Sequence, residues 1–200
     1  MKITDLSEDD LIKWVGNKGH KSFRGKQLFQ WLYLHKVEDI NQMNNLPKKF
    51  REEITNHFSL NRIEIIKQEI AKDGTIKIAQ KLADDYQIES VLMNHDDHYT
   101  LCISTQVGCA MACKFCLTAQ MGFKRNLSPG EIIDQLLNAY QFIPADKRIR
   151  NIVYMGMGEP FNNYDNTIKS LEIFLNPSGL NFSSRRITVS TSGVIPGIIR

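Results

Sequence analysis

Residues 106–120 read QVGCAMACKFCLTAQ, and the three cysteines of this stretch decide how the rest of the sequence is interpreted. Cys109, Cys113 and Cys116 are separated by three and then two residues, so one short loop carries three thiolate ligands. Thiolates suit iron–sulfur clusters and zinc. A four-iron cluster held by only three cysteines would keep one iron free to bind a small molecule. The spacing makes a disulfide framework the least favoured interpretation.

Zinc is the alternative that the spacing leaves open, with Cys102 as its fourth ligand. Structural zinc sites usually bring their ligands as short-spaced pairs that lie well apart in the sequence. This stretch has one such pair, one longer step and the more distant Cys102. The pattern therefore favours an iron–sulfur cluster over zinc.

The composition is that of an ordinary globular protein. The chain has 200 residues, of which 42% are hydrophobic and 24% charged, enough for one or two domains with a core. No apolar run approaches the roughly 20 residues of a membrane span, and the N-terminal MKITDLSEDDLIKW has acids where a signal peptide has basic residues. We therefore expect a cytoplasmic protein with reduced thiols and no membrane partner.

The net charge of +3 is too small to indicate a nucleic-acid partner by itself. Basic residues are concentrated between positions 18 and 26, where no acid occurs. On charge alone, this stretch is better explained as the solvent-exposed start of a helix than as a binding site.

The first 60 residues have the periodicity of a small helical domain. Ser7 with Asp10 three residues later predicts a capped helix. Apolar residues at helical spacing predict a second helix over residues 24–36, and Pro47 is placed to open a third.

From residue 61 the period changes to that of strands. Residues 62–71 and 75–82 flank Asp73-Gly74, which predicts a hairpin, and residues 87–93 and 99–104 predict two more strands. Beyond the cysteines, helices over about 128–140 and 166–175 alternate with strands over 152–155 and 186–190. We expect an α/β fold whose parallel strands are joined by helical crossovers.

Three loops are expected at the carboxyl ends of these strands, where ligands of such sheets gather. They are residues 105–123 with the cysteines, 156–160 (GMGEP) and 190–193. Gly158 would let a ligand approach the backbone, and Pro160 would keep Glu159 extended. Ser190 would add a hydroxyl, although a helix-capping role explains it equally well.

These features resemble the radical S-adenosylmethionine superfamily, in which a C-x3-C-x2-C loop with an aromatic residue before its last cysteine (Phe115 here) holds a [4Fe-4S] cluster. The stretches LCISTQVGCAMACKFCLTAQMGFKRNLSPGEI, YMGMGEP and RRITVSTSG are similar to the 23S rRNA adenine-C2 methyltransferases that also modify tRNA. FRGKQLFQWLY and NNLPKKFR resemble the helical accessory domain of that family. The resemblance covers nearly the whole chain.

The resemblance implies a domain order of 1–60 as a helical RNA-binding accessory domain, 61–98 as a β-rich hairpin segment, and 99–200 as the first half of a radical S-adenosylmethionine (βα) barrel. It also implies site residues: Cys109, Cys113 and Cys116 as cluster ligands, Gly158, Glu159 and Ser190 as contacts to S-adenosylmethionine, Glu89 as proton acceptor, and Cys102 as the thiol that resolves a covalent protein–RNA intermediate. From the residues alone, Glu89 is an ordinary strand acid and Cys102 a small buried strand residue.

The implied reaction is radical methylation of C2 of an adenine, with 23S rRNA, tRNA and an external electron donor as partners. An adenine C2–H bond is neither acidic nor nucleophilic, so the cofactors must supply the reactive species. The target base must also leave its stack.

The resemblance leaves two functional alternatives. The related adenine-C8 methyltransferases typically have GEA where this chain has Pro160, which favours the C2 enzyme. The methyl-carrying cysteine of the family falls beyond Arg200, so we expect a truncated chain that yields no methylated adenine alone. An inactive RNA-binding fragment is the second alternative.

Overall fold

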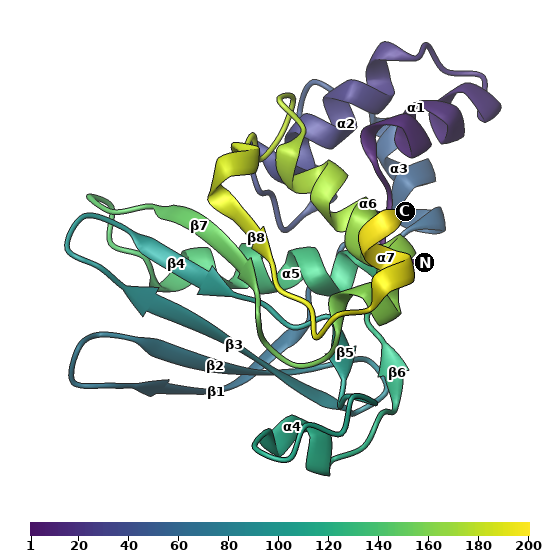
Figure 1. Cartoon of the computed structure of the whole chain (residues 1–200). Coiled ribbons are helices and arrows are strands. Elements are labelled where there is room, and N and C mark those ends of the chain that lie inside the picture. The colour runs from purple at the N-terminus through teal and green to yellow at the C-terminus, as the bar shows by residue number, and fades with distance from the viewer.

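The computed structural model describes residues 1–200 and begins with a helical region (Figure 1). Its helices are α1 (Glu8–Asn17), α2 (Phe23–Tyr33) and α3 (Lys48–His57). The predicted cap of α1 is confirmed, because the Ser7 hydroxyl accepts from the Asp10 backbone N–H and the Asp10 carboxylate accepts from the Ser7 backbone N–H. Pro47 precedes the first residue of α3 as predicted.

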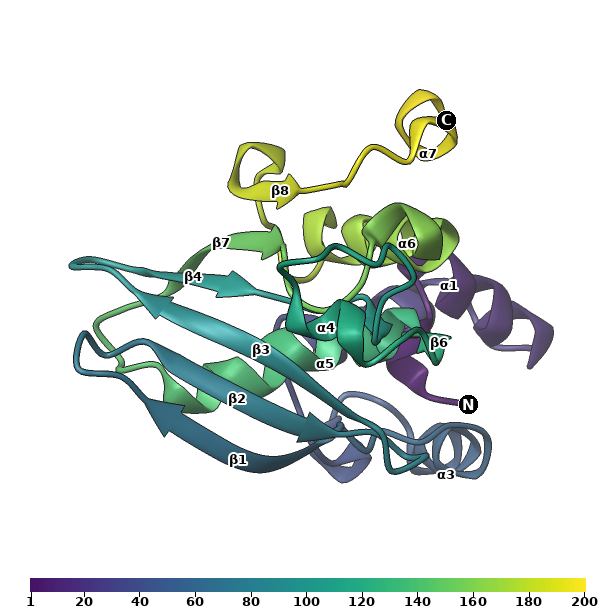
Figure 2. The ribbon, with the colours of Figure 1, turned by 60° about the horizontal axis from the view of Figure 1, so that its bottom comes forward.

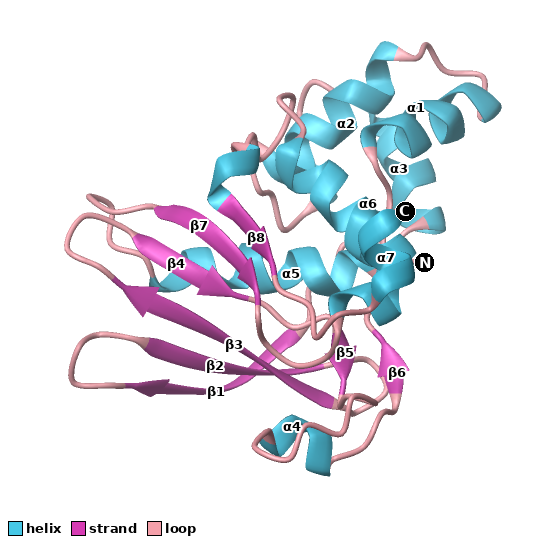
Figure 3. Ribbon diagram, viewed as in Figure 1, coloured by secondary structure: helices cyan, strands magenta, loops and turns pink.

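A six-stranded sheet with the order β1-β2-β3-β4-β7-β8 forms one side of the molecule (Figure 3). The strands are β1 (Glu64–Ile70), β2 (Ile76–Lys81), β3 (Gln87–Asn94), β4 (Tyr99–Cys102), β7 (Ile149–Tyr154) and β8 (Ile187–Val189). Strands β1 to β4 pair antiparallel, whereas β4, β7 and β8 pair in parallel. Strands β1 and β8 each have one neighbour, so the sheet is open and the barrel is not closed.

Helices cover one face of this sheet and leave the other open (Figure 2). The crossover after β4 contains α5 (Pro129–Ala139), and the crossover after β7 contains α6 (Tyr164–Leu175). Every residue of α5 is buried, and its start is fixed by a capping box between Ser128 and Glu131. This arrangement confirms the predicted α/β fold.

The helical region packs directly against the crossover helices. Lys2 forms an ion pair with the buried Asp134 of α5, whose carboxylate also accepts from the Ile63 backbone N–H at 3.1 Å. The Asp5 carboxylate accepts from the Gly130 N–H at 2.9 Å. The two regions share one continuous cluster of buried apolar side chains, so the N-terminal residues stabilise the start of the sheet.

Four short elements are present that the periodicity did not predict. Strands β5 (Gln106–Val107) and β6 (Arg125–Asn126) form a two-residue ladder, and α4 (Leu117–Gln120) lies between them. Helix α7 (Ile195–Ile199) follows β8. Such elements are too short to show a hydrophobic period. None of the helices combines the length and the apolar character that crossing a bilayer requires.

Candidate cluster and cofactor site

The three cysteines lie on a long loop, residues 108–124, that projects from the carboxyl end of β4 and is closed at its base by β5 and β6 (Figure 1). Gln106 pairs with Asn126 and Val107 with Arg125 across this base. The Lys124 N–H adds a bond to the Val107 carbonyl at 2.9 Å. The loop therefore leaves the fold at residues 106–107 and returns beside them at residues 124–126.

A glycine makes this close approach possible. Gly108 has φ +71°, and a Cβ at this position would lie 1.7 Å from the carbonyl oxygen of Gly122. Gly122 also has a positive φ, but a Cβ there would meet nothing within 4 Å. Any side chain at Gly108 must therefore push the two sides of the loop base apart.

Arg125 fastens the base of the loop to the sheet and to α5. Its guanidinium donates to the Asp84 carboxylate at 2.5 and 3.0 Å and to the Glu131 carboxylate at 2.8 and 2.9 Å. Hydrogen bonds to the Glu131 and Asp84 carboxylates raise the pKa of Arg125 above its usual value. Because Asp84 lies between β2 and β3 and Glu131 in α5, one side chain links three parts of the fold.

The structure places Cys109, Cys113 and Cys116 on the same loop, each partly buried and none in a disulfide. It does not bring three His, Cys, Asp or Glu side chains into a metal-binding group. The donor set nevertheless fits an iron–sulfur cluster by its chemistry, because it offers three free soft ligands within eight residues. The Met111 N–H already points to the Cys109 sulfur at 3.5 Å, and the Cys116 N–H donates to the Cys113 carbonyl at 3.0 Å.

The GMGEP loop lies against the segment that leads into the cysteine loop. The Met157 carbonyl accepts from the Thr105 and Gln106 N–H groups at 2.8 and 3.1 Å. A Cβ on Gly156 would lie 2.7 Å from the Ile103 carbonyl, and one on Gly158 would lie 2.5 Å from the Gln106 side chain. Both positions therefore require glycine because residues 103–106 pack too closely against them to leave room for a Cβ.

Glu159 is the buried acid of this site, with a side chain held by several donors. Its carboxylate accepts from the Phe161 N–H at 3.0 Å and from both the N–H and the hydroxyl of Ser192 at 2.8 Å. Burial opposes the charged form of Glu159, but the hydrogen bonds from Ser192 and Phe161 outweigh it and lower the pKa of the carboxyl. A deprotonated carboxylate at this position suits an amine or a hydroxyl ligand.

Ser190, the residue that the sequence singled out in this strand end, is exposed and makes none of the bonds to Glu159. Ser192, two residues further along, donates both of the bonds from this loop to the Glu159 carboxylate. The contact of Ser190 with S-adenosylmethionine stays a prediction.

Glu89 and Cys102 lie on one face of the sheet, opposite the face on which Ile88 and Ser90 are buried. Cys102 is opposite Val91 in the register, and Glu89 lies two residues before Val91, so all three side chains share this face. The Glu89 carboxylate is exposed and lies 3.3 Å from the Lys77 amino group. Burial raises the pKa of the Cys102 thiol, opposed by a backbone hydrogen bond from Met155.

Sequence reasoning missed Gln106, Ser192 and Arg125. The Gln106 amide donates to the Asn126 side chain at 2.7 Å and accepts from the Glu159 N–H at 2.8 Å, so it joins the cysteine loop to the GMGEP loop. No spacing rule marks such residues. The one feature of the sequence that could have indicated them is their position within one or two residues of the ends of the predicted loops.

Two family models match separate parts of the chain. The model for the ribosomal RNA large subunit methyltransferase N-terminal domain matches residues 1–60. The model for the radical SAM superfamily matches residues 103–200, which include the cysteine loop, the GMGEP loop and the end of β8.

Curated relatives and a solved structure agree with these matches. A probable dual-specificity RNA methyltransferase RlmN of Geobacillus kaustophilus is 44% identical over 197 residues, which are 98% of this chain and 54% of the relative. The dual-specificity RNA methyltransferase RlmN of Desulfosudis oleivorans is 44% identical over 196 residues, or 98% of this chain and 53% of the relative. The crystal structure of a radical SAM methyltransferase from Sphaerobacter thermophilus superposes with a TM-score of 0.90 at 39% identity, covering 99% of this chain and 59% of that one.

The chain thus spans about half the length of the curated relatives it matches. It matches them across nearly its whole length, through both its helical region and its sheet. The chain belongs to the RlmN family of radical SAM RNA methyltransferases.

Proposed function

We propose that this chain serves the methylation of C2 of adenine in 23S rRNA and in tRNA, with S-adenosylmethionine and a [4Fe-4S] cluster as cofactors and an external electron donor. The observation that carries the proposal is the cysteine loop itself, with three free thiols at the carboxyl end of β4. The dual-specificity RlmN name of relatives 44% identical to the chain supports the two RNA substrates.

In this proposal Cys109, Cys113 and Cys116 hold the cluster, and Gly158, Glu159 and Ser190 contact S-adenosylmethionine. When bound, the two cofactors supply the radical chemistry that an unactivated C2–H bond requires. Glu159 would receive the amino group of the cofactor on a carboxylate that its hydrogen bonds keep charged. The role of the protein is to orient the cofactor and exclude water.

Two side chains on the open sheet face would act on the RNA. Glu89 would accept the proton from C2, with its carboxylate held near the Lys77 amino group. The Cys102 thiol would free the methylated RNA from its covalent link to the protein. Because burial keeps the Cys102 thiol protonated, a base must remove its proton before it can attack.

The domain organisation remains part of the proposal: residues 1–60 for RNA binding, 61–98 as a β-rich hairpin segment and 99–200 as half of the barrel. Strands β1 to β3 belong to the same sheet as the barrel strands. They would therefore extend the floor of the site toward the RNA.

Cluster formation is tested on the chain alone. After anaerobic reconstitution, we expect about four irons per chain, brown absorbance, and a change in the electron paramagnetic resonance spectrum of the reduced protein when S-adenosylmethionine is added. Alanine at Cys109, Cys113 or Cys116 should abolish iron retention, whereas Cys102→Ala should preserve it. A colourless protein with one zinc, or a spectrum that S-adenosylmethionine leaves unchanged, would contradict the proposal.

Substrate position is tested by mass spectrometry of digested RNA. Unmodified 23S rRNA fragments and tRNA are incubated with S-adenosylmethionine, a reductant and the chain joined to the remaining half of the Geobacillus kaustophilus relative. We expect 2-methyladenosine, and Glu89→Gln and Cys102→Ala should each suppress it. Formation of 8-methyladenosine instead would assign the chain to the C8 reaction.

A further inference from the structure

A cleft of about 280 Å³ opens beside the first residues of β7 and the segment that precedes β8. It is lined by cationic and aromatic side chains from both segments, among them Tyr140, Arg148, Arg150, Phe182 and Arg186. We call this set the arginine cleft. Three guanidinium groups from two chain segments converge on it, although nothing in the cysteine or GMGEP loops requires them.

The charges of the arginine cleft are poorly compensated. Arg148 and Arg186 form no ion pair, and Arg186 donates only to the neutral Asn151 side chain at 3.5 Å. Arg150 lies 3.3 Å from Asp97, a carboxylate that is itself shared with His98. Arg125, by contrast, is fully engaged by two carboxylates. Unpaired arginines grouped in a cleft are typical of sites for oxyanions.

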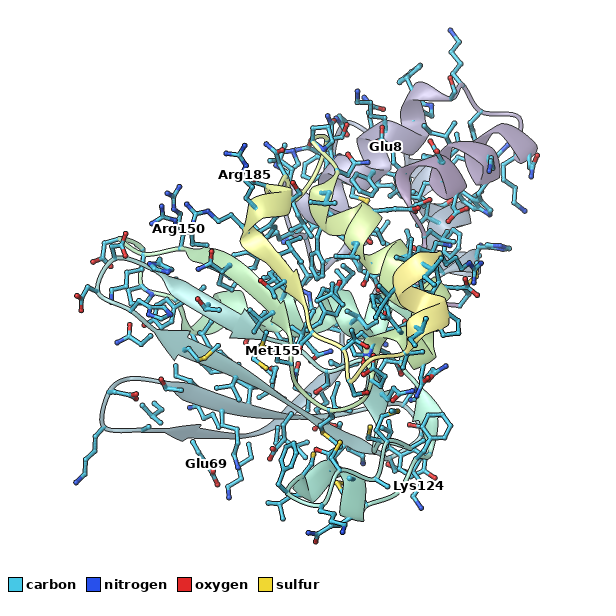
Figure 4. The ribbon with its side chains drawn as sticks, viewed as in Figure 1. Glu8, Glu69, Lys124, Arg150, Met155 and Arg185 are labelled. Atoms are coloured by element: carbon cyan, nitrogen blue, oxygen red, sulfur yellow. The ribbon has the colours of Figure 1, made fainter.

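The basic surface continues past the cleft in both directions. Arg185 is exposed beside Arg186, and it projects on the same side of the molecule as Arg150 (Figure 4). At the other end, the Lys36 amino group lies 4.5 Å from the centre of the Tyr140 ring. Because Lys36 follows α2, the basic surface extends to the helical region. A row of cations longer than one small ion suits a polymer with repeated phosphates.

The arginine cleft lies far from the proposed reaction centre. Arg148 and Arg186 precede β7 and β8 and therefore mark the amino ends of these parallel strands, whereas the cysteine loop follows the carboxyl end of β4. Figure 4 shows Arg150 and Arg185 at the opposite side of the molecule from Lys124, which ends the cysteine loop. A ligand held here cannot be the base that is modified.

We propose that the arginine cleft binds backbone phosphates of the RNA at a second contact, away from the target adenine. This inference rests on the proposed function for its choice of RNA as the partner. Phosphate contacts fix the register of a bound nucleic acid but do not read its bases. The cleft would therefore raise the affinity for all RNAs alike and leave the choice of adenine to the cysteine-loop side.

The test measures RNA affinity by fluorescence anisotropy at several salt concentrations, for a 23S rRNA fragment and for an unrelated RNA of equal length. The variant is Arg148→Ala/Arg186→Ala, whose two side chains are exposed and unpaired, so we expect it to fold. The matched control is Lys13→Ala/Lys169→Ala, which removes the same charge from a surface rich in acids, where Lys169 pairs with Asp10. The variant with lysine at both arginine positions keeps the charge.

We expect the alanine cleft variant to lower affinity about tenfold or more for both RNAs, and to reduce the slope of log Kd against log salt by about one for each lost phosphate contact. The control should keep the wild-type slope, and the lysine variant should restore most of it. Equal slopes for the cleft and control variants, or no RNA binding by the wild-type chain, would overturn the proposal. So would loss of binding to only one of the two RNAs, which would indicate base reading.

Two further measurements separate the causes of failure. Reconstituted iron content and visible absorbance report on the proposed function, and we expect the cleft variant to match the wild type in both. Titration with inorganic phosphate alone tests for a free-anion site. Submillimolar phosphate binding that the cleft variant loses, combined with unchanged RNA affinity, would replace the RNA contact by a site for a small anion.

Discussion

Replacing Arg125 with alanine tests whether the base of the cysteine loop depends on a single clamp. The substitution removes four hydrogen bonds from the guanidinium to Asp84 and Glu131. The Glu131 side chain is only 11% exposed. After the substitution, the donor left to its carboxylate is the Ser128 backbone N–H of the capping box, at 2.9 Å. The loop base would then be held by the backbone bonds of residues 106–107 with 124–126 and by the Gln106–Asn126 side-chain bond.

The size of the effect follows from how deeply each partner is buried. Removing one member of a buried pair costs about 3–5 kcal/mol, whereas exposed pairs contribute about 0.2–1 kcal/mol. Arg125 is 30% exposed and Asp84 41%, so the pair with Asp84 is close to a surface pair and the pair with Glu131 is closer to a buried one. We expect Arg125→Ala to lower the free energy of unfolding by about 2–3 kcal/mol.

The assay is urea unfolding of the chain without metal, together with hydrogen exchange of residues 106–126. Arg125→Lys should recover less than half of the loss, because one ammonium cannot reproduce the bidentate contacts. The control is Lys81→Ala, which breaks the exposed pair with Asp85 and should leave the urea midpoint nearly unchanged. If Arg125→Ala costs no more than this control, or if the loop-base amides keep their protection, the clamp is refuted.

Three further predictions concern the same site. Gly108→Ala should lower the melting temperature and the iron content far more than Gly122→Ala, because only the first Cβ meets a carbonyl, at 1.7 Å; equal losses would contradict this steric account. The lowered pKa of Glu159 means that its stabilising charge is present above the pKa of the unfolded chain and is lost as the pH falls through the folded value. Thermal unfolding between about pH 7 and pH 3 should therefore decline less steeply in Glu159→Gln than in the wild type, and parallel curves would argue against the Ser192 hydrogen bonds. Because burial raises the pKa of Cys102, iodoacetamide at about pH 8 should label it more slowly than Cys116 in the metal-free chain, as followed by peptide mass spectrometry; faster labelling of Cys102 would count against its burial.

Much of the fold could be predicted because its signals are local. The capping boxes at Ser7 and Ser128 depend on residues three positions apart, and both helices begin where these residues indicated. The Asp73-Gly74 turn likewise connects β1 and β2 as expected. The boundaries of β7 differed by three residues at its start, because Ile149 is buried by contacts that no local period reveals.

The contacts of the candidate site were harder to predict from the sequence, because the residues that meet there are distant along the chain. Glu159 is held by Ser192, which lies 33 residues further along the chain. Gln106 joins Asn126 to Glu159 across 20 and 53 residues. No spacing within one segment encodes such a contact.

The sequence by itself determined the chemistry available to this protein: three thiols on one loop, a carboxylate next to a proline, and the alternation of strands and helices that places both at strand ends. Covalent order is sufficient for these features because ligand type, turn formation and helix capping act over a few residues. Only the tertiary structure decided which groups meet. It brought Arg125 to Asp84 and Glu131, and it gathered Arg148, Arg150 and Arg186 in one cleft at the far end of the strands. These contacts depend on parallel strands lying side by side, an arrangement set by burial of the shared core.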